Sequence, residues 1–305
     1  GNSGTVNSDI RVKGTWALPG LQGFLRGTEI DVQSPVQVWK ITGGAIDMSF
    51  RKRDVTLHTL TANINEYPFI MDGSIRYDKR FQLDAKFKGE FNRSSPFEIA
   101  FDNDAAKDSL RGTIAFRDLS FKDILDLFHI QQNIRGNLDF TLQVNGSLAN
   151  PAMQFSGDID GLVLNGVSFH TARVRGDYHD NWFAIDTLNL NKQSAFIGGK
   201  GRVSGELDLR EIRLKEFAKY VDLRFVASSF PVQSFDALFP ADNHLVGVLN
   251  ADIIYHQDNE GKSLSGFTDL SGIGMDIPYF EQKIQSGAAK FDFTGDEILV
   301  RNGRF

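Results

Sequence analysis

The stretch that decides the fold is residues 136–146, which read GNLDFTLQVNG. Apolar residues alternate with polar ones, so in an extended chain the apolar ones lie on one face. These residues are Leu138, Phe140, Leu142 and Val144. The Asn145-Gly146 pair that follows is typical of a tight hairpin turn. The stretch therefore predicts a β-strand with one apolar face, joined to its neighbour by a hairpin.

The same alternation continues through most of the chain. The sequence has 26 Phe and 29 Gly but only 8 Pro, a composition typical of strands joined by tight turns. The clearest further runs are Phe81, Leu83, Ala85 and Phe87; Phe97, Ile99 and Phe101; and Phe183 and Ile185. We therefore predict a mainly β protein with roughly 20 antiparallel strands.

Helical periodicity is scarce. Residues 121–128 (FKDILDLF) and 232–239 (VQSFDALF) each place apolar residues on one stripe, and 214–221 is a possible third helix. Each segment is too short to be stable alone and must dock on the sheet or plug its end. We predict two or three short helices.

The first two helical segments reveal an internal repeat. Phe128 precedes Gly136 by eight residues, and Phe239 precedes Gly247 by the same distance (136 − 128 and 247 − 239). An alternating strand follows each Gly, so the period is about 110 residues. We predict three β repeats at 1–118, 119–229 and 230–305 that form one continuous structure.

Charge and composition limit the classes of partner. The chain of 305 residues has 33 Lys and Arg against 39 Asp and Glu, a net charge of −6. This balance is unlike the basic surface that nucleic acids require, so we expect no nucleic-acid partner. The chain has no Cys and no apolar run of the roughly 20 residues that span a bilayer. Residues 298–303 read as a strand and turn interrupted in mid-pattern, so we interpret the chain as a fragment of a longer protein.

The sequence offers no set of residues typical of catalysis. The six His are scattered, without the paired spacing of a metal site. The Gly-rich segments 198–201 and 272–274 lack the strand, loop and long helix of a phosphate-binding site. We predict no enzymatic activity, no catalytic residue, no metal site and no cofactor.

Several segments together resemble a known family. Residues 145–157, NGSLANPAMQFSG, follow the strand that begins at Gly136 and resemble the repeat of TamB, the inner-membrane subunit of a bacterial translocation and assembly module. The segment 188–205, which ends GGKGRVSG, is similar to the wider AsmA-like group. Residues 119–128 and 230–240 resemble the short helical stretch that this group places before its strands.

The resemblance covers most of 115–305 and, more loosely, 10–90. It implies an elongated β-structure with an apolar groove that crosses the periplasm and moves phospholipid between the inner and outer membranes. It also implies an inner-membrane anchor and an outer-membrane barrel partner, both through regions outside this chain. The expected partners are thus phospholipid acyl chains and, for the whole protein, that barrel.

A sheet with one apolar face must cover it, and a few short helices cannot do so. The sheet can curl around its own apolar face, which would leave a groove for acyl chains, or a second sheet can close it. We predict the curled sheet, with a closed β-sandwich that binds glycan or protein as the alternative. A β-rich hydrolase is a third reading, but no carboxylate pair supports it. The predicted groove residues are Phe81, Leu83, Phe87, Phe97, Ile99, Phe101, Leu138, Phe140, Leu142, Val144, Phe155, Phe183, Ile185 and Phe196.

Overall fold

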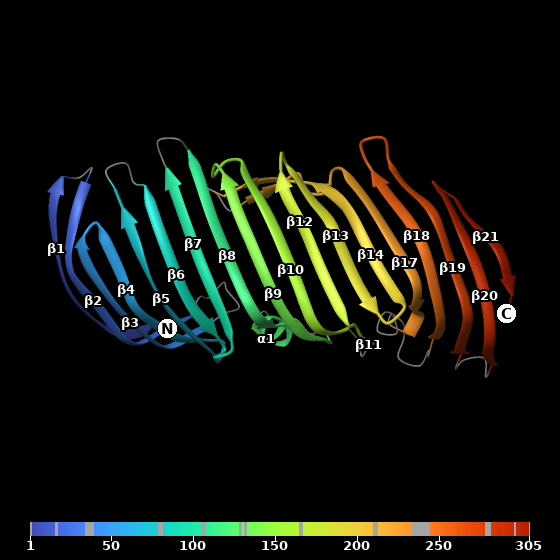
Figure 1. Cartoon of the computed structure of the whole chain (residues 1–305), viewed down its shortest axis with the longest axis horizontal. Coiled ribbons are helices and arrows are strands. Elements are labelled where there is room, and N and C mark those ends of the chain that lie inside the picture. The colour runs from blue at the N-terminus through green and yellow to red at the C-terminus, as the bar shows by residue number, and fades with distance from the viewer. Residues whose placement is uncertain are drawn as a thin grey trace. The chain divides into compact units, whose positions relative to one another are not determined.

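The protein is built almost entirely from antiparallel strands (Figure 1), as the sequence predicts. The computed structural model describes residues 2–15, 18–33, 40–78, 82–104, 108–127, 130, 133–164, 167–209, 213–233, 245–277, 282–295 and 297–304. The chain divides into two compact units. Unit 1 contains residues 1–132 and 137–153, and unit 2 contains 133–136 and 154–305.

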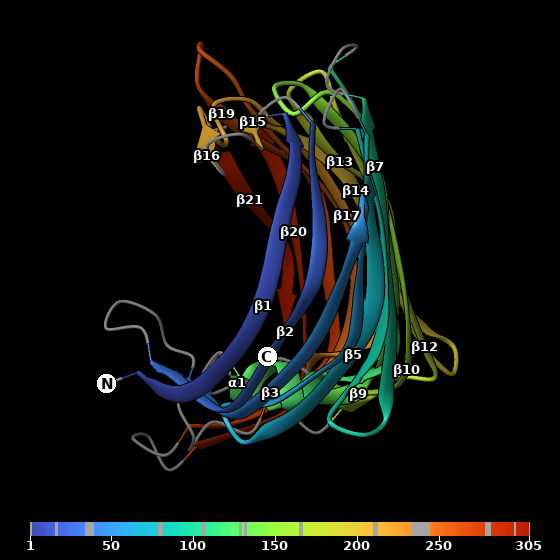
Figure 2. The ribbon, with the colours of Figure 1, turned by 90° about the vertical axis from the view of Figure 1, so that its left-hand side faces the viewer.

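Unit 1 is an antiparallel meander in which each strand pairs with the next along the chain. Its elements are β1 (Ser3–Thr15), β2 (Leu18–Gln33), β3 (Lys40–Lys52), β4 (Asp54–Ile64), β5 (Tyr67–Tyr77), β6 (Leu83–Phe91), β7 (Ser95–Asp104), β8 (Ser109–Ser120), α1 (Phe121–Leu127) and most of β9 (Ile134–Gly146). In Figure 2, the long strands β1, β2 and β3 bend along their length, so this sheet is curled and not flat.

Unit 2 continues the same construction. It contains most of β10 (Pro151–Leu164), then β11 (Val167–Ser168), β12 (Thr171–His179), β13 (Trp182–Lys192), β14 (Ala195–Ser204), β15 (Glu206–Asp208), β16 (Arg213–Lys215), β17 (Val221–Pro231), β18 (Leu245–Gln257), β19 (Lys262–Ile277), β20 (Gln282–Gly295) and β21 (Glu297–Arg304). From β12 to β21 the strands pair in chain order, except that β15 and β16 form a separate hairpin inserted between β14 and β17.

The internal repeat is visible in the backbone. In β8, Asp118 takes a positive φ of 52° at a bulge, and its N–H donates to the Asp139 carboxylate at 2.8 Å. In β17, Ser229 takes a φ of 50° at a bulge, and its N–H donates to the Asn250 side chain at 2.8 Å. Both pairs are offset by 111 residues (229 − 118 and 250 − 139). The two repeats therefore share a bulge together with the side chain that holds it.

Glycines at the same offset support this repeat. Gly136 and Gly247 have φ values of 136° and 145°, and Gly161 and Gly272 have φ values of 60° and 59°. The first two values are open almost only to Gly, whereas the last two favour Gly but are also adopted here by residues such as Ala218, whose φ is 60°. The three repeat boundaries predicted from the sequence remain a prediction, because the two compact units divide the chain on a different basis.

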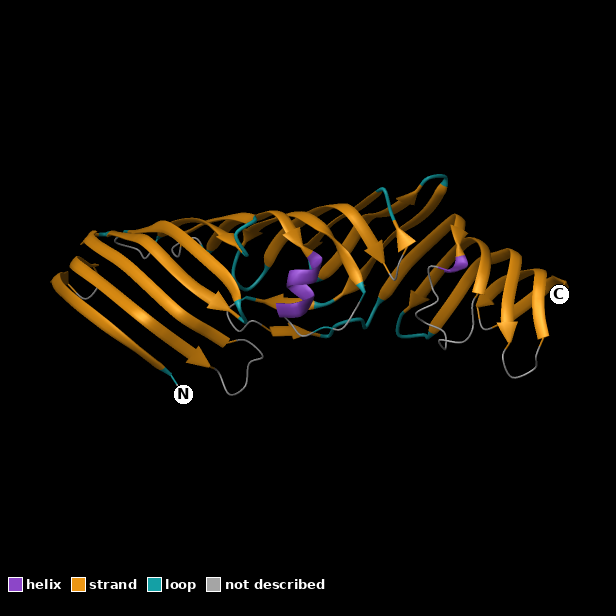
Figure 3. Cartoon of the chain, turned by 90° about the horizontal axis from the view of Figure 1, so that it is seen from below, coloured by secondary structure: helices purple, strands orange, loops and turns teal. Residues whose placement is uncertain are grey.

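The predicted helices have three different outcomes. The first is confirmed as α1, the single α-helix of the described residues (Figure 3), and Ser120 caps it by accepting a hydrogen bond from the N–H of Asp123 at 3.3 Å. Residues 234–239 of the second lie outside the described part of the chain. The prediction of a helix at 214–221 was wrong: β16 ends there in a turn, because Glu216 and Ala218 take positive φ values of 47° and 60°. Neither value is compatible with a right-handed helix.

Candidate functional site

The candidate site of unit 1 is an unbroken apolar face. Residues that pair across neighbouring strands point to the same side of a sheet, so the register assigns them to rows that cross the strands. Three adjacent rows cross all nine strands, and Ser8 is their only polar member. The rows are Val6, Gly27, Ile46, Leu60, Met71, Gly89, Phe97, Phe116 and Phe140; Ser8, Leu25, Met48, Leu57, Gly73, Phe87, Ile99, Ile114 and Leu142; and Ile10, Gly23, Phe50, Val55, Ile75, Ala85, Phe101, Gly112 and Val144. We call these residues the apolar face of unit 1.

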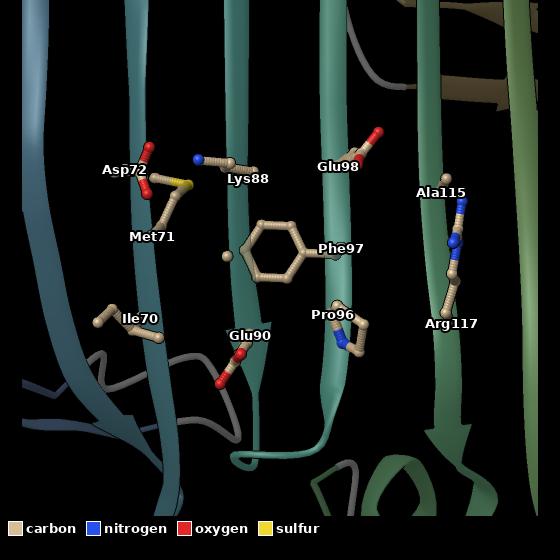
Figure 4. A pocket seen from close by; sticks show the side chains of 11 residues that line it. Ile70, Met71, Asp72, Lys88, Glu90, Pro96, Phe97, Glu98, Ala115 and Arg117 are labelled. Atoms are coloured by element: carbon tan, nitrogen blue, oxygen red, sulfur yellow. The ribbon is translucent and has the colours of Figure 1, made fainter.

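Glycines on this face make room for aromatic rings from neighbouring strands. A Cβ atom at Gly89 would lie 2.7 Å from the Cζ atom of Phe97, and one at Gly73 would lie 2.4 Å from Cδ1 of Phe87. Figure 4 shows the Phe97 side chain reaching from β7 toward β6. Its ring stacks on that of Phe69 with 5.3 Å between centroids. Each ring thus lies along the sheet across a glycine.

Most of the apolar face is only partly covered. Leu57, Ala85 and Phe97 are buried, but their neighbours in the three rows are mostly half-buried, and Val6 in β1 is 61% exposed. In a closed β-sandwich, the corresponding side chains would be packed by a second sheet. The only described element of unit 1 outside this sheet is α1, which is too short to cover nine strands. The face is therefore accessible to an apolar ligand.

The helix α1 sits at one end of this face, near the turns between strands. The Asn65 side chain donates to the carbonyl of Leu127 at 3.0 Å, and the Tyr67 hydroxyl donates to Asp126 at 3.0 Å. Lys122 and Tyr67 both donate to Asp126 and lower the pKa of its carboxyl group. The Tyr67 ring also packs on Phe91. The helix thus closes an end of the apolar face without covering its middle.

Nearly all the predicted groove residues of unit 1 share one face of its sheet. Phe81 lies outside the described residues. The others share one side of the sheet, with Leu83 and Leu138 just outside the three rows and the rest within them. These residues are Leu83, Phe87, Phe97, Ile99, Phe101, Leu138, Phe140, Leu142 and Val144. Whether they contact lipid stays a prediction.

Unit 2 has a corresponding apolar face from β12 to β21. Its rows are Gly176, Ile185, Gly201, Leu223, Tyr255, Leu264 and Gly295; Val174, Leu188, Gly199, Phe225, Ile253, Gly266, Phe293 and Ile298; and Ala172, Leu190, Ile197, Ala227, Ala251, Thr268, Phe291 and Val300. We call these the apolar face of unit 2. Here too a glycine receives a ring, since a Cβ at Gly176 would lie 2.5 Å from Cζ of Phe155.

This second face is closed along one side and open along the other. In the third row Ala172, Ala227 and Ala251 are buried, and their small side chains let Phe169 and Phe230 stack above the sheet at 5.9 Å. In the first row Ile185 and Leu223 are 37% and 38% exposed. The first row is therefore the part of unit 2 that resembles the open face of unit 1, because Phe225 and Ile253 of the second row pack against the buried cluster.

One predicted groove residue belongs to the other face. Phe196 pairs with Asn191 and Ser228 and covers Gly198, whereas Ile197 is buried in the cluster on the apolar face. The error has a simple cause, because Phe196 and Ile197 are both apolar and the sequence does not show which of them points inward. Phe155, Phe183 and Ile185 do lie on the apolar face of unit 2.

The opposite face of each sheet is charged. In unit 1, Arg76 donates to Asp54 at 2.7 Å across β4 and β5. In unit 2, Arg224 makes a two-pronged contact with Asp252 at 2.6 and 2.8 Å, which lowers the pKa of that carboxyl group. Each of these exposed ion pairs contributes little to stability. Together they make this face polar and hydrated, unlike the apolar face.

Two features of the charged faces were not visible from the sequence. A depression of about 450 Å³ crosses β5 to β8 in unit 1 (Figure 4), where Lys88 lies between Asp72 and Glu98. In unit 2, the His256 ring contacts Asp222 at 2.5 Å and Asp258 at 3.2 Å, and these contacts raise its pKa. The register brings Lys88 between Asp72 and Glu98 and places Asp222 beside His256, whereas Asp258 is only two residues from His256 in the chain.

The described part of the chain contains no group of three or more His, Cys, Asp or Glu side chains placed to hold a metal ion. None of its helices has the length and apolar character needed to cross a membrane. The three rows of unit 1 offer apolar side chains, and ion pairs such as Arg76 with Asp54 lie on the other face of the sheet.

No family model, curated protein or solved structure matched the chain. The resemblance to TamB-like and AsmA-like proteins therefore rests on the sequence segments quoted above. The apolar faces follow from the strand register and do not depend on this resemblance.

Proposed function

We propose that the apolar faces bind the acyl chains of phospholipids and that the protein is part of a lipid-transfer conduit. The observation that carries this proposal is the set of three apolar rows that cross nine strands of unit 1 with a single polar residue. An apolar face of this extent and exposure is unusual for a soluble surface and is typical of a binding site.

The spacing of the rows suits a hydrocarbon chain. Neighbouring strands lie about 4.8 Å apart and same-face residues in one strand lie about 6.8 Å apart. Each methylene removed from water contributes about 0.8 kcal/mol, so ten buried carbons are held by roughly 8 kcal/mol against water. A tail that leaves a bilayer for this face loses and regains nearly the same free energy. It can therefore move along the rows without being trapped.

The resemblance to TamB-like and AsmA-like proteins extends this proposal to a cellular role. We place the protein in the periplasm as part of an inner-membrane-anchored protein, where it shields phospholipid between the two membranes and contributes to outer-membrane biogenesis. The anchor and the docking to an outer-membrane barrel would come from other parts of that protein. In this role the protein is a conduit and not an enzyme.

The proposal is tested by charges placed on the apolar face. Phe140→Arg and Leu142→Asp should abolish co-purified phospholipid in native mass spectra while circular dichroism still shows β-structure. Thr141→Asp and Gln143→Asp are matched controls, because they introduce charge in the same strand on the other face. If the control variants lose lipid equally, or if the unaltered protein carries none, the proposal is wrong.

A second candidate is a closed module of the cell envelope that binds glycan or protein through its loops. The observation in its favour is the sealed cluster around Phe169 and Phe230 in unit 2. If the apolar face of unit 1 were sealed in the same way in solution, Leu142→Asp would leave an unpaired charge in a dry core and unfold the unit. A variant that stays folded supports the conduit.

A further inference from the structure

A large aromatic residue is exposed to solvent beside the apolar face of unit 2. Figure 2 shows the β15–β16 hairpin. Phe217 comes two residues after the end of β16 and is 60% exposed. Its ring meets the edge of Phe183, on the apolar face, with 6.2 Å between centroids. A lone exposed aromatic is common on protein surfaces, so the surroundings of Phe217 decide whether it has a role.

The turn that carries Phe217 is firmly fixed. The residues on either side of it, Glu216 and Ala218, have positive φ values that side chains rarely adopt. Ala218 N–H donates to the carbonyl of Ser204 at 2.8 Å, and the Gln257 side chain donates to the carbonyl of Ala218 at 2.9 Å. The Ser204 hydroxyl accepts from the N–H of Tyr220 at 2.9 Å. Phe217 is thus presented to solvent by a strained and well-anchored turn.

Several residues around this turn are of the types found at membrane interfaces, beside the acidic Glu216 and Asp222, which lie 4.0 Å from Lys219 and 3.0 Å from Arg202. The rings of Trp182 and Tyr220 lie 6.3 Å apart. The Arg202 guanidinium lies 4.5 Å from the Trp182 ring, and the Lys219 ammonium lies 5.5 Å from the Tyr220 ring. Trp and Tyr gather at the level of lipid headgroups, and Lys and Arg attract the phosphates there.

Phe183 leads from this turn onto the apolar face, whereas Trp182 and Arg202 lie on the opposite face of the sheet. Phe183 contacts Phe217 on one side and is the neighbour, within β13, of the exposed Ile185. Ile185 and Leu223 belong to the first row of unit 2 and are 37% and 38% exposed. Apolar side chains therefore continue from Phe217, at the tip of the turn, through Phe183 to Ile185 in the first row of unit 2.

We infer that the turn 216–220 docks on a phospholipid bilayer: Phe217 enters the acyl region, Trp182 and Tyr220 lie at the headgroups, and a tail passes by way of Phe183 to the row of Ile185. This inference rests on the proposed function, because it identifies where lipid would reach the apolar face.

The test uses vesicles of phosphatidylcholine and phosphatidylglycerol. Phe217→Ser should weaken vesicle co-sedimentation about tenfold or more, because a buried Phe side chain contributes about 1.5–3 kcal/mol. Ile70→Ser is the matched control, since Ile70 is 46% exposed on the charged face of unit 1; it should change nothing. Equal loss in both variants, no change in either, or no vesicle binding by the unaltered protein overturns the inference.

A second measurement does not depend on the affinity of a variant. The chain has no Cys, so Phe217→Cys and Ile70→Cys each allow one environment-sensitive fluorophore to be attached. Vesicles should shift the emission of the label to shorter wavelength at 217 and not at 70. If neither label shifts but lipid still co-purifies, docking at this turn is wrong and the conduit stands. If the label at 217 shifts while no lipid occupies the apolar face, the conduit fails and membrane docking stands.

Discussion

The fit of Phe97 over Gly89 gives a quantitative test of the apolar face. A methyl group added by Gly89→Ala would lie 2.0 Å from the carbonyl oxygen of Ile70 and 2.7 Å from Cζ of Phe97. Both distances are far below van der Waals contact, so the strand and the ring must move. Overpacking of this kind costs about 1–3 kcal/mol, and replacing Gly in a strand restores about 0.5–1 kcal/mol. We expect a net loss of about 1–2 kcal/mol in the free energy of unfolding.

Gly112→Ala is the matched control. Gly112 lies on the same face, but its added methyl would stand 3.4 Å from Cβ of Phe101, an ordinary contact. This variant should be as stable as the unaltered protein or about 0.5 kcal/mol more stable. Urea unfolding followed by circular dichroism measures both changes through the midpoint, provided that the slope is unchanged. If Gly89→Ala proves as stable as Gly112→Ala, the ring does not lie across Gly89 and our description of the face is wrong.

Three further changes follow from the structure. Ser120→Ala removes the cap that accepts from the N–H of Asp123 and should cost about 1 kcal/mol in thermal or urea unfolding; an unchanged midpoint would mean that the cap contributes nothing. The contact with Asp222 raises the pKa of the His256 side chain in the folded protein. This contact therefore stabilises the fold below about pH 6.5, and the stabilisation is lost as the pH rises through the higher pKa of the folded state. The gap in melting temperature between the unaltered protein and His256→Gln should therefore be wider at about pH 6 than at about pH 8.5, and an opposite trend would contradict this pairing. Ile197→Ala leaves a cavity in the sealed cluster of unit 2 and should cost about 2–5 kcal/mol by urea unfolding; a loss below this range would show that the cluster is loosely packed.

The fold could be predicted from the sequence because strand periodicity is local. The alternation in 138–144 fixes the face of each residue once the strand is known, and the structure keeps that assignment. The repeat was also detectable, since Gly136 and Gly247 recur with their strands. The bulges at Asp118 and Ser229 were not, because a bulge depends on a hydrogen bond from a side chain in another strand.

The candidate site was predictable only in part, for a related reason. Parity assigns residues to a face within one strand, but two adjacent apolar residues such as Phe196 and Ile197 leave the choice open. Members of the face such as Met71, Phe116 and Ile114 were missed, and carrying the alternation across each hairpin could have found them. The turn at Phe217 resembled a helix because its apolar spacing is helical, and the positive φ values that break it leave no clear signal in the sequence.

The central claim is that the apolar face stays open and holds hydrocarbon. It is tested most directly by a fluorophore attached through Ile99→Cys, in the middle row of the apolar face, or through Glu98→Cys, next to it on the charged face. The quencher is a phospholipid with a nitroxide on its acyl chain. Strong quenching at 99 with little at 98 is the result we predict. Equal quenching at both positions, or none at 99 in a folded protein with lipid present, would contradict the claim.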